Sequence, residues 1–93
     1  MQKKVNNLVK KEFLFAFGKH LKELRISKGF SQIELGERCG ADAAKVSKTE
    51  RGIYDFKISS LLVVAKGLDI SLAELFNFTE SDNYVFSIFN EIE

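Results

Sequence analysis

Residues 31–52, SQIELGERCGADAAKVSKTERG, restrict the fold of this chain more than any other stretch. They predict two short helices joined by a tight turn. Ser31 and Glu34 have the spacing of a capping box, in which the Ser hydroxyl accepts a backbone N–H and the Glu side chain reaches back to the cap. Gly40 permits the backbone to reverse, and Asp42 follows as the cap of the second helix.

The second of these helices has too little apolar surface to be stable alone. Val46 is its single large apolar residue, so one narrow side faces inward. A scaffold must therefore hold this helix, and its outer surface is small and basic, as a helix entering the DNA major groove requires. The residues left outside or on the flanks are Ala43, Ala44, Lys45, Ser47, Lys48 and Arg51.

Residues of roughly 17 to 76 resemble the Cro and repressor-type helix-turn-helix proteins, called the XRE or lambda-repressor-like family. The resemblance implies an all-α, five-helix domain that binds duplex DNA. It rests on Ser31-Gln32 opening the first motif helix, the small Gly36, the turn residue Gly40, the apolar Val46, Ser47, and the ending Glu50-Arg51-Gly52.

The rest of the chain divides into three parts. Residues 1–11 are expected to be a basic N-terminal extension, residues 12–76 the helix-turn-helix domain, and residues 77–93 a C-terminal extension. The extension is expected to be helical, with a strand as the alternative. Inside the domain, apolar stripes and caps predict further helices over 12–28, 58–68 and 72–76. The stripes are Phe13, Phe17, Leu21 and Leu24 in the first of these helices, and Ile58, Leu61, Leu62, Ala65 and Leu68 in the second.

The net charge of +1 hides an uneven distribution. Residues 1–57 hold 13 Lys or Arg and 7 Asp or Glu, a net charge of +6, whereas residues 58–93 hold 1 and 6, a net charge of −5. The basic part contains the helix-turn-helix, which favours a protein that turns one end towards phosphate. Two ordinary solvated surfaces are the alternative.

Several classes of protein are disfavoured by composition. One cysteine, Cys39, allows no internal disulfide and fits a small core residue in a reducing cytosol. One histidine, His20, offers neither a zinc site nor a Cys-His catalytic pair. The N-terminus lacks the apolar core of a signal peptide, and no apolar run is long enough to span a bilayer. We expect no enzyme, metal or cofactor.

The resemblance also implies a pair between Arg25 and Glu50 that ties the first helix to the end of the recognition helix. The two residues are expected to form a partly buried clamp, and a loose surface pair worth about 0–1 kcal/mol is the alternative.

The expected DNA contacts follow from the motif. Ser31 and Gln32 would lie on a phosphate at a helix N-terminus. The recognition helix, 42–51, would enter the major groove, where Lys can reach guanine or phosphate and Ala can touch thymine methyls. Asp55 would oppose DNA unless it points away or caps the next helix. The expected DNA-binding residues are Ser31, Gln32, Asp42, Ala43, Ala44, Lys45, Ser47, Lys48, Arg51, Tyr54 and Lys57.

The expected function is sequence-specific DNA binding by a homodimer that regulates transcription in the cytoplasm. A single unit of this size touches too few bases to select a site. The rival interpretation is an antitoxin or coregulator whose main partner is another protein. The dimer interface is expected to form from apolar residues that the domain core does not need, although the tail can instead cover its own core. The expected interface residues are Phe76, Phe78, Tyr84, Val85, Ile88, Phe89 and Ile92, with Phe15 beside them.

Overall fold

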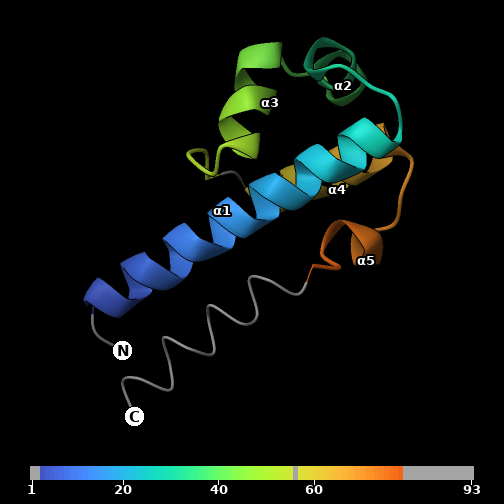
Figure 1. The fold of residues 1–93 in the computed structure, drawn as a ribbon. Coiled ribbons are helices and arrows are strands. Elements are labelled where there is room, and N and C mark those ends of the chain that lie inside the picture. Colours follow the sequence, from blue (N-terminus) through green and yellow to red (C-terminus); the bar gives the residue numbers. More distant parts are fainter. Residues whose placement is uncertain (1–2, 56, 79–93) are drawn as a thin grey trace.

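The computed structural model describes residues 3–55 and 57–78, with side-chain surroundings from residue 6 onward (Figure 1). In this part of the chain the fold consists of five helices without a strand. The predicted all-α, five-helix architecture is therefore confirmed. The helices are α1 (Lys3–Ser27), α2 (Gln32–Cys39), α3 (Ala43–Glu50), α4 (Ile58–Leu68) and α5 (Leu72–Leu75).

Helix α1 is longer than the sequence analysis predicted. It begins at Lys3, whereas a start near Glu12 was expected after a separate basic extension. The physical reason is that the chain contains no proline and no glycine before Gly18, so nothing stops the helix from propagating towards the N-terminus. At the other end, Gly29 adopts the left-handed conformation (φ 79°) that the predicted stop requires.

The core lies between all five helices, because each of them contributes at least one buried apolar residue to it. From α1, Phe17 and Leu21 are almost fully buried, and Leu24 packs against them. Phe13, the fourth member of the predicted stripe, remains 37% exposed but stacks on Phe17 with ring centroids 6.4 Å apart. The other buried apolar residues of the core are Leu35, Val46, Ala65, Leu68 and Leu75.

Helix α4 has the predicted limits but faces the core differently. Ile58 and Leu62 were expected in its buried stripe, yet they are 85% and 47% exposed. The buried side is made by Ala65 and Leu68, with Leu61 and Val64 packed against the core. Because apolar residues occur on several sides of this helix, periodicity alone did not determine which side faces inward.

Helix α5 begins with the predicted capping box between Ser71 and Glu74, and ends at Leu75 with Phe76 as its C-cap. No described helix has the length and apolar character needed to cross a membrane. The predicted structure of the tail, including Tyr84, Val85, Ile88, Phe89 and Ile92, lies outside the described residues.

Candidate nucleic-acid interface

The first motif helix, α2, is held at its N-terminus by the predicted capping box. The backbone N–H of Glu34 donates to Ser31 Oγ at 3.0 Å, and the N–H of Ser31 donates to Glu34 Oε1 at 3.3 Å. Ser31 remains exposed, so the start of α2, with the positive end of its helix dipole, faces solvent.

The turn between α2 and α3 depends on two glycines. Gly40 adopts the left-handed conformation (φ 69°) at the end of α2. The Gly36 carbonyl accepts the N–H of Ala41 at 2.7 Å, and a Cβ added at Gly36 would lie 2.7 Å from the Ala41 carbonyl oxygen. Position 36 therefore has no room for a side chain, which explains why the motif has a small residue there.

The second motif helix, α3, is capped by Asp42, whose carboxylate accepts the N–H of Lys45 at 2.8 Å. Its inner side contains Val46, as predicted, and also Thr49 and Glu50, which are 7% and 9% exposed. Sequence reasoning did not identify Thr49 as buried; its hydroxyl donates to the Lys45 carbonyl at 2.8 Å, which satisfies it locally. The opposite side of α3 carries Ala44, Ser47, Lys48 and Arg51, spaced at i, i+3, i+4 and i+7.

Helix α1 lies close to the end of α3 at Gly18. A Cβ added at this buried glycine would lie 2.6 Å from the carbonyl oxygen of Glu50. Sequence reasoning did not single out Gly18, although a glycine in the middle of an otherwise regular helix is a signal of close packing.

Arg25 and Glu50 meet in a bidentate ion pair. Arg25 Nε donates to Glu50 Oε2 at 2.6 Å and Arg25 Nη2 donates to Glu50 Oε1 at 3.1 Å, with side chains only 10% and 3% exposed. The remaining guanidinium nitrogen, Nη1, donates to the Phe30 carbonyl at 2.8 Å. The pair therefore joins the last turn of α1 to the last turn of α3, away from solvent.

Gln32 belongs to the same cluster. Its side-chain nitrogen donates to Glu50 Oε1 at 3.0 Å, so in this structure the amide contacts the clamp and not the solvent side of α2. The sequence predicts that this side chain donates to a phosphate. Its position shows that the first residue of α2 also orients the end of α3.

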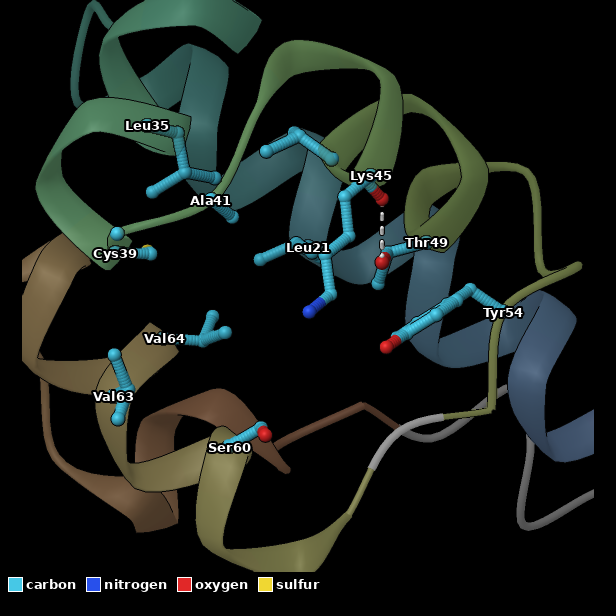
Figure 2. A pocket seen from close by; sticks show the side chains of 12 residues that line it. Leu21, Leu35, Cys39, Ala41, Lys45, Thr49, Tyr54, Ser60, Val63 and Val64 are labelled. Atoms are coloured by element: carbon cyan, nitrogen blue, oxygen red, sulfur yellow. Dashed lines mark hydrogen bonds between the residues drawn. The ribbon is translucent and has the colours of Figure 1, made fainter.

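Lys45 and Tyr54 lie beside each other at the flank of α3. The Lys45 ammonium is 5.1 Å from the centre of the Tyr54 ring, a distance at which cation–π attraction operates (Figure 2). Lys45 thus points towards the loop after α3, whereas Lys48 lies on the outer side of the helix. Of the other loop residues, Lys57 is exposed at the start of α4, and its side chain makes no cap hydrogen bond.

Asp55 is turned towards α1. Its carboxylate forms an ion pair with Lys10, in which Oδ2 lies 2.9 Å from Nζ and both side chains are more than half exposed. The alternative that Asp55 caps α4 is not realised, because the N-cap of α4 is Lys57. The acidic residue in the loop therefore has a basic partner within the same chain.

Two of the residues expected at the dimer interface contact α1 of their own chain. Phe76 lies 5.8 Å from Phe17, ring centre to ring centre, and Phe78 lies 5.8 Å from Phe13 and 6.0 Å from Phe17. His20 packs at 5.1 Å against Phe78, and its Nε2 is 3.0 Å from the Glu74 carbonyl oxygen. These contacts match the alternative in which the beginning of the tail covers its own core.

Two further observations concern metal and thiol chemistry. In the described ranges, no three His, Cys, Asp or Glu side chains lie together as a metal site would require. Cys39 is partly buried against Gly67, and burial raises the pKa of its thiol, which keeps it in the unreactive protonated form.

Comparison with known proteins agrees with this geometry. Residues 16–76 match the protein family described as a helix-turn-helix domain. Over 56 residues the chain is 32% identical to a protein named Neisseria hypothetical transcription factor, from Neisseria meningitidis serogroup B. That alignment covers 60% of this chain and 53% of the Neisseria protein, so the chain spans about half the length of this curated relative.

Two crystal structures are similar over most of the described domain. One is the restriction-modification controller protein C.AhdI from Aeromonas hydrophila, with 41% identity and a TM-score of 0.66, covering 68% of this chain and 96% of that one. The other is the hypothetical transcription factor NHTF from Neisseria, with 32% identity and a TM-score of 0.62, covering 67% of this chain and 72% of that one. The chain belongs to the helix-turn-helix domain family. These relatives are named a hypothetical transcription factor and a restriction-modification controller protein, and this chain is their homologue.

Proposed function

We propose that this chain is an XRE-type regulator that binds duplex DNA sequence-specifically as a homodimer. The observation that carries the proposal is the two-sided character of α3. Its inner side is fixed to α1 through Glu50, while its outer side presents Ala44, Ser47, Lys48 and Arg51 to solvent. A small, basic helix surface on a rigid support suits the major groove.

The proposed DNA contacts are of two kinds: phosphate contacts that position the protein and base contacts that recognise the sequence. The exposed N-terminus of α2 at Ser31 and the exposed Lys57 would contact phosphates, because backbone N–H groups and lysines bind anions without regard to sequence. Lys48 and Ser47 would contact base edges, and Ala44 a thymine methyl. Asp42, Ala43 and Tyr54 would line the edge of this surface, and Arg51 would lie at its C-terminal end. Gln32 would contribute to DNA binding chiefly through its hydrogen bond to Glu50. Lys45 would contribute chiefly through its contact with Tyr54.

A second copy is needed because one helix-turn-helix contacts too few bases to select a site. The expected tail interface stays a prediction, since most of it lies outside the described residues. Within the described ranges, α4 offers a second surface for the partner copy: Ile58 is 85% exposed, and Leu62 one turn further is 47% exposed. Apolar side chains this exposed at helical spacing favour a covered face in the assembly.

Among types of regulator, we propose that this chain is a restriction-modification controller. The support is the 41% identity to C.AhdI over 96% of that protein. Genes for a restriction enzyme and a methyltransferase next to the gene for this chain would agree with the assignment. A toxin gene in that place would instead favour the antitoxin interpretation.

Binding to random duplex DNA at increasing salt tests the DNA-binding proposal against the protein-interaction alternative. A DNA-binding protein releases counterions, so the logarithm of its affinity should fall steeply and linearly with the logarithm of salt concentration, with a slope of about −0.9 per phosphate contact. A slope near zero, or no binding at low salt, would show that the helix-turn-helix serves only as a scaffold.

A further inference from the structure

A cavity of about 160 Å³ lies behind the recognition helix. It is lined by residues of α1, α2, α3 and α4 and by Tyr54 of the following loop, and it is partly open to solvent (Figure 2). An apolar cavity of about 150 Å³ is large enough to hold benzene in a protein core. The space is therefore sufficient for a small organic molecule. Apolar side chains form most of its inner wall: Leu21, Leu35, Val46, Val63 and Val64.

The polar groups of this cavity are placed at one side. Figure 2 shows the Lys45 amino group and the Tyr54 hydroxyl end directed into the space, with Ser60 across from them. Lys45 is the only charged side chain among the described residues that line the cavity, and no carboxylate is present there to neutralise it. The charge of a complementary ligand would therefore be negative.

We propose that this cavity binds a small monocarboxylate with a compact apolar body, of the size of benzoate or a branched five-carbon acid. The apolar body would pack against the valine and leucine side chains and remove apolar surface from water on both sides. The carboxylate would pair with the Lys45 ammonium at the opening, and the Ser60 hydroxyl can donate a hydrogen bond to it.

Occupancy of the cavity would affect DNA binding, a consequence that rests on the proposed function. Lys45 belongs to α3, two residues before Ser47 and three before Lys48 on the outer side. A carboxylate would hold the Lys45 ammonium inside the cavity and neutralise it, which removes one positive charge from the flank of the DNA-binding surface. Saturating ligand should therefore weaken DNA binding, by less than the Lys48→Ala substitution does.

Direct binding to the full-length protein tests the site without DNA. We would titrate ¹⁵N-labelled protein with benzoate, with its neutral analogue benzyl alcohol and with the cationic benzylamine, and follow backbone amide shifts. Benzoate should saturate with a dissociation constant of about 1 mM or below, as expected for a ligand of its size. The shifts should cluster at residues 35, 39–41, 45–46 and 60–64. Benzyl alcohol should bind about tenfold more weakly, and benzylamine more weakly still.

Matched variants identify the anion partner. Lys45→Met keeps the length of the side chain and removes its charge, so it should reduce benzoate affinity to that of benzyl alcohol and leave benzyl alcohol unchanged. Lys48→Met removes a charge from the same helix outside the cavity and should change neither. Val63→Phe places a larger side chain at the rim of the cavity, from a position that is already 47% exposed, and should block all three compounds.

Equal affinity for benzoate and benzylamine, equal loss of benzoate binding in Lys45→Met and Lys48→Met, or shifts spread over the basic surface would overturn the proposal. Saturable binding without any effect on DNA affinity would overturn the coupling to α3. A protein that binds benzoate as described but does not bind DNA would contradict the proposed function and not the ligand site.

Discussion

At the residue scale, the central contact of this protein is the buried pair between Arg25 and Glu50. A charge pair this enclosed requires hydrogen bonds on most of its polar atoms, because each ion has lost its water. Here the guanidinium makes three hydrogen bonds, and Glu50 Oε1 accepts a further one from Gln32. Within the described residues no buried side-chain nitrogen or oxygen lacks a partner. The cluster therefore fixes the relative positions of α1, α2 and α3.

Removing one charge of this pair should be costly. Glu50→Gln keeps the shape of the side chain but leaves the Arg25 guanidinium buried without its counterion, so the free energy of unfolding should fall by about 3–5 kcal/mol. Lys10→Met breaks the exposed pair with Asp55 and is the matched control, with an expected change of about 0–1 kcal/mol. Urea denaturation measures both. Equal effects of the two variants would mean that burial of the clamp contributes nothing.

A second residue-scale prediction concerns Gly18. Alanine normally stabilises the middle of a helix by about 1 kcal/mol relative to glycine. At position 18 the added methyl would meet the Glu50 carbonyl oxygen at 2.6 Å, and a backbone atom cannot move aside without shifting α3. Gly18→Ala should therefore destabilise the protein by about 1–3 kcal/mol in thermal unfolding. A variant that unfolds at a higher temperature than the wild type would show that α1 and α3 are not in such close contact.

At the element scale, local sequence signals predicted most of the helices. The capping boxes at Ser31 and Ser71 and the glycine at Gly40 each act within a few residues, so their geometry could be read directly from the sequence. The limits of α4 were also predicted. The start of α1 was not, because no residue in that stretch marks a helix start and the absence of a breaker was the only signal.

The candidate site was less predictable than the helices that carry it. Sequence placed Lys45 and Lys48 on one exposed surface, whereas the structure turns Lys45 towards Tyr54 and keeps Lys48 outside. The sequence also predicted that the Gln32 amide contacts a DNA phosphate, whereas in the structure this amide donates to Glu50, 18 residues away. Both differences depend on contacts between elements, which the spacing of residues along one helix does not contain.

This arrangement predicts unequal roles for the two lysines of α3. Lys48→Ala should weaken binding to a selected DNA site by about 1–3 kcal/mol and relax the preference at one base pair, if Lys48 reads a base. Lys45→Ala should have the smaller effect, because its ammonium lies at Tyr54. Lys66→Ala, an exposed lysine of α4, is the charge-matched control and should change binding least. Gel shifts on selected and scrambled duplexes measure all three; an unchanged affinity for Lys48→Ala would remove the outer side of α3 from the interface.

At the scale of the whole molecule, the described domain leaves apolar surface uncovered. Ile58 and Leu62 on α4 are exposed, while Phe76 and Phe78, which were expected between subunits, already contact α1. We propose two candidate surfaces for a partner copy: the exposed side of α4 and, as the sequence predicts, the tail beyond Phe78. A symmetric pair through either would give the two copies of α3 a fixed spacing.

Light scattering on two variants distinguishes these surfaces. Ile58→Asp should dissociate a dimer held by α4 without affecting the fold, because the side chain is 85% exposed; Ile26→Asp, at a 57% exposed position at the end of α1, is the control. A chain ending at Phe78 keeps the aromatic contacts with α1 and should dissociate a dimer held by the tail. A wild-type protein that stays monomeric at tens of micromolar would contradict the homodimer outright.

Selection of bound sequences from a random duplex pool, followed by affinity measurements on the selected site and on one half of it, tests DNA recognition by the dimer. We expect a palindrome whose half-sites lie about one helical turn apart, bound at least about 10³-fold more tightly than random duplex and much more tightly than a single half-site. A pool without enrichment, or a selected site that a single half matches in affinity, would contradict sequence-specific binding by two copies of α3.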